Sequence, residues 1–366
     1  IVSGTDLWTF MSTNGGITAG RRSADWALFP YETDDRVTAN AEHTGSKTLI
    51  RRTGDTRCWE PFSMRSEGLF RLERNLYKSR IGNSVIFEEV NHDWQLRFCW
   101  QWTAGDRYGF QREATLENRG PEPVTLDVLD GIQNVMPCGV PSDLQRNSSN
   151  LVNAYKQTEL EPQTGIGLFC LSAIIIDRAE PSESLRCNTV YTLGIDADAY
   201  LLSSRQLDTF RMGGSVSDEP ESKGVRGAVM AHAAMHLDAG EHRTWLFVAD
   251  VEQDAVQVRD MLHFIARADA ADKDVNLAVG VAPYFLGCRP AVHVRVGRVF
   301  KLLRHIGIAN LCLQLFCLAD GTGHSFVGRR QHQLGTQGFQ QCASLHRHGV
   351  GHGQYEFIAA YGGDVG

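Results

Sequence analysis

Apolar and polar residues alternate along much of residues 3–251, which is the pattern of half-buried β-strands. The clearest case is WQLRFCWQW, residues 94–102, in which one face is aromatic and aliphatic and the other is mostly polar. We expect the apolar face to be buried between two stacked sheets. That face consists of Trp94, Leu96, Phe98, Trp100 and Trp102.

Neighbouring segments show the same period of two. SVIFEEV, residues 84–90, precedes this strand, and NHD predicts the turn between them. In residues 110–132, two strands flank the turn ENRGPEP, and we expect them to form an antiparallel pair. Residues 167–177 and 228–251 predict three further strands, with DAGE as the turn inside the second segment.

Helical patterns are few. Residues 141–160 predict one short helix, capped by Ser142 or Asp143, and residues 196–210 predict another. Residues 253–270 place apolar side chains near helical spacing. We expect a linker helix there that leaves the β domain.

The last part of the chain has a different composition. Residues 281–366 contain one Glu and one Lys but fourteen Gly and seven His, without a strand or helix period. A long structureless run is unusual in a compact domain. We therefore divide the chain into a β-sandwich domain over 1–252, a linker helix over 253–270, and a tail over 271–366 that we expect to be poorly ordered or frame-shifted.

Composition narrows the class of protein. The net charge of −7 argues against a nucleic-acid binder, and no apolar run reaches the roughly 20 residues of a membrane span. The nine cysteines form no C-x-x-C pair, so we expect a reduced, cytoplasmic protein rather than a disulfide framework. The chain opens at Ile1 with no readable signal peptide, and we expect the natural N-terminus to lie upstream.

Most clusters of reactive side chains are interpreted as structural, and no metal site is expected. His232 and His236 share the polar face of a strand, and His242 follows nearby. A second cluster has ligand spacing but no flanking strand or helix to hold a metal: Cys342, His346, His348 and His352. Five acids are interpreted as solvated strand-end or turn residues: Glu88, Glu89, Asp93, Asp130 and Asp177.

One stretch near the start has a composition that suits a sugar site. Residues 9–35 combine flat aromatic rings, which can stack on a sugar, with charged groups that can bind hydroxyls or phosphate. The structural alternative is that the aromatic residues only pin an edge hairpin onto the sandwich. The candidate substrate-binding residues are Arg21, Arg22, Asp25, Trp26, Tyr31 and Asp34.

In the order of its motifs, the chain resembles the N-terminal β-sandwich domain of cellobiose-phosphorylase-like proteins. The similarity covers roughly residues 3–260. It rests on NGGITAGRRSADWALFPY, WEPFS, YGFQREATLENRGPEPVTLDVLD and MHLDAGEHRTWLFVADV. The L-x-N-x-G hairpin and the L-x-x-G-E turn are each moderately specific, and their combination in this order is more so.

The resemblance implies a large antiparallel supersandwich of the galactose-mutarotase-like kind. It also implies a catalytic (α/α)6 barrel after the linker helix, and phosphorolysis or hydrolysis of an oligosaccharide or β-glucan-type substrate. Phosphorylases of this kind use inorganic phosphate as co-substrate and no other cofactor, and a homodimer is compatible with the family. Nothing after Asp260 resembles the barrel, so no catalytic residue is carried over, and we expect the chain alone to be inactive.

A second interpretation stays open: a free-standing carbohydrate-binding or structural sandwich that has no catalytic partner domain. The linker helix distinguishes the two, because its amphipathic pattern has no reason to exist if nothing follows it. A mutarotase-like epimerase is a third interpretation. It needs a His and a Glu that converge on one face of a sheet, and His92 with Glu88 is the nearest such pair.

Overall fold

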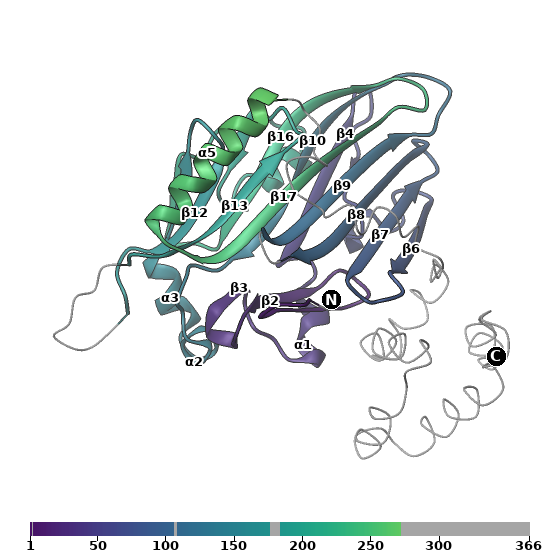
Figure 1. The fold of residues 1–366 in the computed structure, drawn as a ribbon. Coiled ribbons are helices and arrows are strands. Elements are labelled where there is room, and N and C mark those ends of the chain that lie inside the picture. Colours follow the sequence, from purple (N-terminus) through teal and green to yellow (C-terminus); the bar gives the residue numbers. More distant parts are fainter. Residues whose placement is uncertain (2, 106–107, 176–183, 272–366) are drawn as a thin grey trace, which may run out of the picture. The chain divides into compact units, whose positions relative to one another are not determined.

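Two large antiparallel sheets make up most of the computed structural model, which describes residue 1 and residues 3–105, 108–175 and 184–271 (Figure 1). The larger sheet has nine strands in the order β15-β11-β12-β13-β17-β9-β8-β7-β6. They are β6 (Leu72–Lys78), β7 (Ser84–Asn91), β8 (Leu96–Gly105), β9 (Gly109–Asn118), β11 (Lys156–Glu161), β12 (Ile166–Leu171), β13 (Cys187–Leu193), β15 (Glu221–Lys223) and β17 (His242–Gln253). The expected mainly β, antiparallel fold is thereby confirmed.

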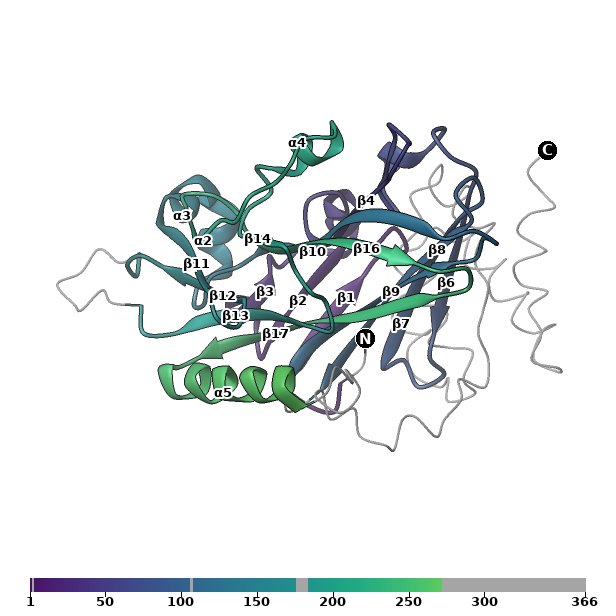
Figure 2. The same cartoon turned by 90° about the horizontal axis from the view of Figure 1, so that it is seen from above.

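The smaller sheet has five strands in the order β14-β16-β10-β4-β5. They are β4 (Gly45–Arg52), β5 (Cys58–Trp59), β10 (Val124–Val135), β14 (Ala199–Leu201) and β16 (Gly227–Leu237). It packs face to face with the larger sheet (Figure 2). Side-chain hydrogen bonds connect the two sheets. Trp102 Nε1 on β8 donates to Ser46 Oγ on β4 at 3.1 Å, and Trp245 Nε1 on β17 donates to Asp130 on β10 at 2.6 Å.

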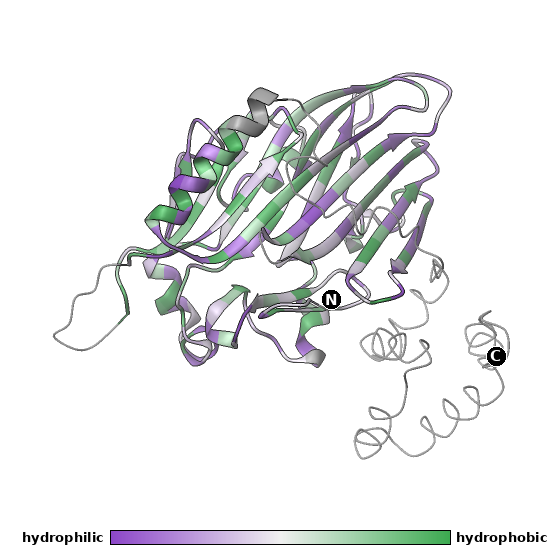
Figure 3. Ribbon diagram, viewed as in Figure 1, coloured by the Kyte–Doolittle hydropathy of each residue, from purple (hydrophilic) through white to green (hydrophobic). Residues whose placement is uncertain are grey.

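The core between the sheets contains the aromatic row that the sequence predicts, and all five of its side chains are buried. Hydrophobic and hydrophilic residues alternate along the strands in Figure 3. The strand itself begins at Leu96, because Trp94 and Gln95 lie in the preceding turn. Trp94 is buried from that turn, where its Nε1 donates to Asp55 at 2.9 Å and its ring contacts Phe70.

A third sheet lies at one end of the sandwich, in the order β1-β2-β3 (Figure 1). Its strands are β1 (Leu7–Met11), β2 (Ile17–Arg21) and β3 (Ala27–Phe29). Phe29 packs edge-to-face on Trp102 with ring centroids 6.0 Å apart, and Asn188 of β13 donates to the carbonyl of Ala27 at 3.2 Å. The first part of the chain therefore closes the end of the core.

All helices except the last are short. They are α1 (Asp34–Val37), α2 (Ser142–Asn147), α3 (Ser149–Tyr155), α4 (Leu207–Arg211) and α5 (Ala255–Ala271), with 3₁₀ turns at Ala24–Trp26, Thr38–Asn40 and Met64–Ser66. The expected helix over 253–270 is confirmed as α5. Within the described ranges, no helix combines the length and the apolar composition that crossing a bilayer demands.

The apolar side of α5 packs on the outer face of β13 and β17. Ile265 is buried there against Tyr191 and Leu246, with Met261 and Leu262 beside it. The amphipathic pattern is therefore explained by packing on the helix's own sandwich. For this reason it does not separate the two main interpretations of the sequence.

The expected pairing of the two strands in residues 110–132 is wrong. β9 pairs with β8 and β17 in the larger sheet, whereas β10 pairs with β4 and β16 in the smaller one. The turn between them carries the chain from one sheet to the other, and DAGE does the same between β16 and β17. Local alternation reveals which face of each strand is buried but does not reveal its partner.

Two helical expectations also need correction. Residues 141–160 form two short helices and then strand β11, and Ser142 is the first residue of α2 rather than a side-chain cap. Residues 196–210 contain strand β14 before α4. Residues 272–366, and with them the expected tail and the Cys342 cluster, lie outside the described residues.

Candidate functional site

The opening stretch, residues 9–35, places its two arginines in ion pairs. Arg21 contacts Asp6 at 2.7 Å and Asp250 at 3.0 Å. Arg22 pairs with Glu252, and its guanidinium lies 4.7 Å from the centroid of the Trp26 ring. The structure thus brings Arg22 and Trp26 together, at the point where the three-stranded sheet meets the end of β17.

The other candidates of this stretch lie apart. Asp25 accepts a hydrogen bond from the backbone N–H of Ser142 at 2.6 Å. The Tyr31 ring packs edge-to-face on Trp8, and Asp34 is the first residue of α1. Of these candidates, Arg21, Arg22, Asp25, Trp26 and Tyr31 line neither the large cavity described below nor the small cavity beside Ser46 and Trp100. Their role in substrate binding stays a prediction.

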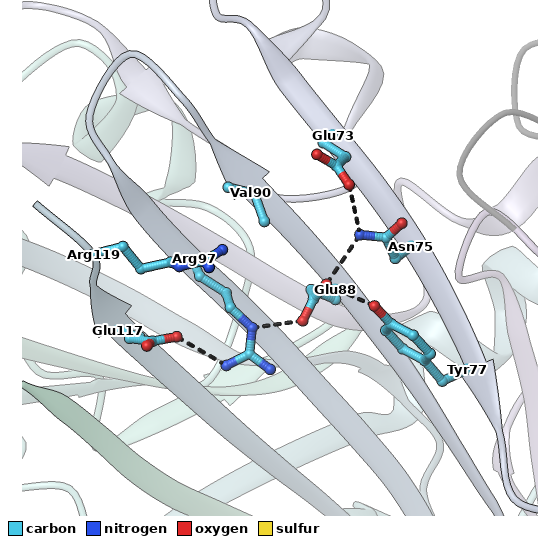
Figure 4. A pocket seen from close by; sticks show the side chains of 8 residues that line it. All are labelled: Glu73, Asn75, Tyr77, Glu88, Val90, Arg97, Glu117 and Arg119. Atoms are coloured by element: carbon cyan, nitrogen blue, oxygen red, sulfur yellow. Dashed lines mark hydrogen bonds and ion pairs between the residues drawn. The ribbon is translucent and has the colours of Figure 1, made fainter. Parts of the chain in front are cut away.

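A cavity of about 560 Å³ opens on the outer face of the larger sheet, near its β6 edge (Figure 4). Alternate residues of neighbouring strands project there, on the side opposite the aromatic row. We call it the β6–β9 pocket. Its lining is Glu73, Asn75, Tyr77, Glu88, Val90, Arg97, Glu117 and Arg119.

A network of hydrogen bonds centres on Glu88 in this pocket (Figure 4). Its carboxylate accepts from Arg97 Nε at 2.5 Å, from the Tyr77 hydroxyl at 2.9 Å and from Asn75 Nδ2 at 3.0 Å. Arg97 also lies 3.2 Å from Glu117, its cross-strand partner on β9. The pocket therefore presents donors and acceptors that are held in place by one another.

Glu88 and Tyr77 keep their protonation states near neutral pH. Burial alone would raise the pKa of Glu88, but hydrogen bonds from Arg97 and Tyr77 hold it below its usual value. Burial and the bond to Glu88 raise the pKa of Tyr77 to about 12. Glu88 is thus an anion and Tyr77 a neutral hydroxyl. A general acid needs a raised pKa, so Glu88 suits binding better than proton donation.

This pocket was not predicted from the sequence. Glu88 was expected to be a solvated strand-end residue, yet its side chain is largely buried within the network. The signal that could have indicated the pocket is the alternation of apolar and polar residues in β7 and β8. It places Glu88 and Arg97 on the polar faces of their strands. Strand pairing, which brings Asn75 opposite Glu88 and Arg97 opposite Glu117, could not be read from that alternation.

Two of the other acids are not solvated either. Glu89 is fully buried and accepts from Trp59 Nε1 at 2.6 Å and from the backbone N–H of Phe62 at 2.9 Å. Asp130 is fully buried beside Arg112. Asp93 does act as a turn residue, since it accepts from the backbone and side chain of Arg71.

His236 is 60% exposed, as the sequence predicts, but His232 is only 18% exposed. His232 pairs with Asp127 and packs edge-to-face on Phe210, on a face of β16 that also carries the buried Met230, so this part of the face is not solvated. No group of metal-ligating side chains with a suitable arrangement occurs among the described residues. His92 contacts Glu73 at 3.3 Å rather than Glu88, so the pair expected for an epimerase does not form as proposed.

No family model and no curated protein matches the sequence. Solved structures match only distantly. A bacterial glucoamylase complexed with acarbose is 10% identical over 72% of this chain and 32% of its own, with a TM-score of 0.42. A provisionally assigned kojibiose phosphorylase from the human microbiome is 10% identical over 77% and 30%, with a TM-score of 0.35.

A galactose mutarotase-related enzyme from Lactobacillus acidophilus is 9% identical over 69% of this chain and 97% of its own, with a TM-score of 0.36. This chain spans about a third of the length of the glucoamylase and of the phosphorylase. At such TM-scores the likenesses carry no argument about function. The architecture rests on the sheets described above.

Proposed function

We propose that this chain supplies the β-sandwich of a carbohydrate-active enzyme, and that the β6–β9 pocket binds part of a glycan. One observation carries the proposal. A polar cavity of about 560 Å³ holds carboxylate, guanidinium, amide and phenol groups in fixed positions. Sugar hydroxyls both donate and accept hydrogen bonds, and pre-arranged polar groups of these kinds match them at a low entropic cost.

The motif resemblance given by the sequence supports the same substrate class. In this proposal the catalytic acid belongs to the helical barrel of the parent enzyme, and the reaction is phosphorolysis or hydrolysis of an oligosaccharide. Inorganic phosphate would then be the co-substrate of a phosphorylase. Cytoplasmic location and a homodimer belong to the proposal as well.

The alternative is a free-standing carbohydrate-binding or structural sandwich. The packing of α5 on its own sheet favours neither interpretation over the other, since Ile265 and Met261 need no further domain to cover them. A sandwich of a carbohydrate-active enzyme and a free-standing carbohydrate-binding sandwich would both bind glycan in the β6–β9 pocket. A purely structural sandwich would not. A binding experiment therefore tests the core of the proposal first.

The test is a glycan array on the full chain, followed by calorimetric titration of the glycans that bind. Glu117→Gln removes the charge that pairs with Arg97 but keeps the shape of the side chain. We expect its dissociation constant to rise about tenfold, the usual effect of losing a hydrogen bond to a charged group. The melting temperature should stay within about 2 °C of the wild type, since surface changes of this kind have small effects.

Asp143→Asn is the matched control, because Asp143 is an acid 87% exposed on α2 and lies outside the pocket. We expect it to bind glycans as the wild type does. Equal affinities for Glu117→Gln and Asp143→Asn would exclude the β6–β9 pocket as the binding site. An array on which the wild type binds nothing would leave only the structural interpretation.

A further inference from the structure

A buried lysine lies on the inner face of the larger sheet, at the edge where β11 and β15 pair. Lys156 is the first residue of β11 and is only 7% exposed. It pairs in register with the buried Leu171 of β12. Thr158, two residues further on, points to the same side and is also buried. The ammonium group is thus removed from most of the solvent.

Lys156 has no acidic partner within the part of the chain that the structure describes. The acids of these two strands are Glu159, Glu161 and Glu221. They alternate onto the opposite face, where Lys223 contacts Glu221 at 2.6 Å. The charge that acts on Lys156 is instead the positive charge of Arg226. Burial, together with this second positive charge, lowers the pKa of Lys156 to about 8.

A hydroxyl group without a partner lies on the same face. Ser222 of β15 is 5% exposed, and its Oγ has no hydrogen-bond partner in the structure. Ser222 pairs in register with Thr158, and the N–H of Gly224 donates to the carbonyl of Lys156 at 3.0 Å. Ser222 and Lys156 are therefore diagonal neighbours on one face of the strand pair.

This face of the strand pair offers Lys156 no anion and Ser222 no hydrogen-bond partner. A buried ammonium group that has no anion and is repelled by a second cation is unfavourable in a folded protein, and so is a buried hydroxyl without a hydrogen-bond partner. A tetrahedral oxyanion satisfies all three at once, because its oxygens accept from ammonium, guanidinium and hydroxyl donors. Arg226 is exposed, so its guanidinium can meet an anion from solvent.

We propose that Lys156, Arg226 and Ser222 form a binding site for a small oxyanion of the phosphate or sulfate class. The site lies on the inner face of the β11–β15 edge, whereas the β6–β9 pocket lies on the outer face at the opposite edge of the sheet. It does not depend on the proposed function, because a failure of glycan binding would leave it untouched.

The experiment measures thermal unfolding of the full chain at pH 7 in chloride, phosphate and sulfate buffers of equal ionic strength. A ligand at ten times its dissociation constant should raise the melting temperature of the wild type by about 3 °C or more. Lys156→Met should lose this rise. In chloride it should melt at or above the wild-type temperature, since the substitution removes an unpaired buried charge.

Lys223→Met is the matched control, because Lys223 is 59% exposed on the opposite face of the same strand pair. It should keep the full rise. Ser222→Ala, which changes the fold least, should raise the dissociation constant of the anion about tenfold in a calorimetric titration. It decides the outcome if Lys156→Met does not fold.

A rise with phosphate or with sulfate supports the site and identifies its ligand. Wild-type melting temperatures that are equal in the three buffers would overturn the proposal. A rise that persists undiminished in both Lys156→Met and Ser222→Ala would overturn it as well, because the anion would then bind elsewhere.

Discussion

At the scale of single residues, a fully buried ion pair joins the two sheets. Arg112 on β9 and Asp130 on β10 are both fully buried and are joined by two hydrogen bonds of 2.8 Å. Asp130 also accepts from Trp245 Nε1 at 2.6 Å and from Thr48 Oγ1 at 2.5 Å. A buried carboxylate with this many donors is well satisfied, but it depends on its cation.

Replacing Arg112 with Met should therefore destabilise the protein strongly. The change leaves Asp130 buried without a counter-charge, and we expect the free energy of unfolding to fall by about 3–5 kcal/mol in urea denaturation. Arg71→Met is the control, because Arg71 is 78% exposed and its pair with Asp93 is on the surface. It should cost less than about 1 kcal/mol. Equal losses in the two variants would contradict the role of the buried pair.

At the scale of elements, two turns carry the chain between the sheets, and one side chain connects them. Asn118 ends β9, and its Nδ2 lies 2.8 Å from the carbonyl oxygen of Glu122 in the first turn. The same nitrogen lies 3.2 Å from the carbonyl of Leu237 and 3.1 Å from that of Asp238 in the second turn. Asn118 is buried, so water does not replace these bonds easily.

Asn118→Ala should leave the buried carbonyl of Leu237 and the carbonyls of Glu122 and Asp238 without this donor. We expect a loss of about 2 kcal/mol in the free energy of unfolding, the usual cost of unsatisfied buried polar groups. Asn83→Ala provides the comparison, because Asn83 Oδ1 accepts from Ser79 Oγ at 2.7 Å within a single hairpin, between β6 and β7. It should cost less than about 1 kcal/mol. If both variants melt alike, Asn118 does not hold the two crossings together.

At the scale of the whole molecule, the outer face of the larger sheet is divided into two parts. Helix α5 covers the β13 and β17 part with apolar side chains, whereas the β6 to β9 part carries the polar pocket. Ile265 is central to the covered part and is 1% exposed. The β6 to β9 part of this face is therefore accessible to a ligand, whereas α5 covers the β13 and β17 part.

Ile265→Ala should lower the free energy of unfolding by about 2–4 kcal/mol, because it opens a cavity between α5 and the sheet. Val256→Ala is the control on the same helix, since Val256 is 55% exposed. Its effect should lie within about 0.5 kcal/mol. Measurement by chemical denaturation distinguishes the two, and an Ile265→Ala variant as stable as the wild type would show that α5 is not part of the cooperative fold.

Much less of the candidate site than of the fold could be predicted from the sequence. Arg97 and Glu88 occupy polar positions of predicted strands, but nothing local says that Glu88 accepts from three side chains on two neighbouring strands. The opening stretch, residues 9–35, was predicted to be a candidate sugar site from its composition alone. Its arginines turned out to pair with Asp250 and Glu252, which lie far away in the sequence.

The sequence by itself determined the strands, their buried faces and the amphipathic helix α5. These features depend on the spacing of apolar residues within a few positions, which is local information. Only the tertiary structure decided that β9 and β10 belong to different sheets, that Asp130 and Glu89 are buried, and where the β6–β9 pocket lies. Each of these depends on contacts between residues distant in the chain, and a pattern of period two is the same whichever strand is the neighbour.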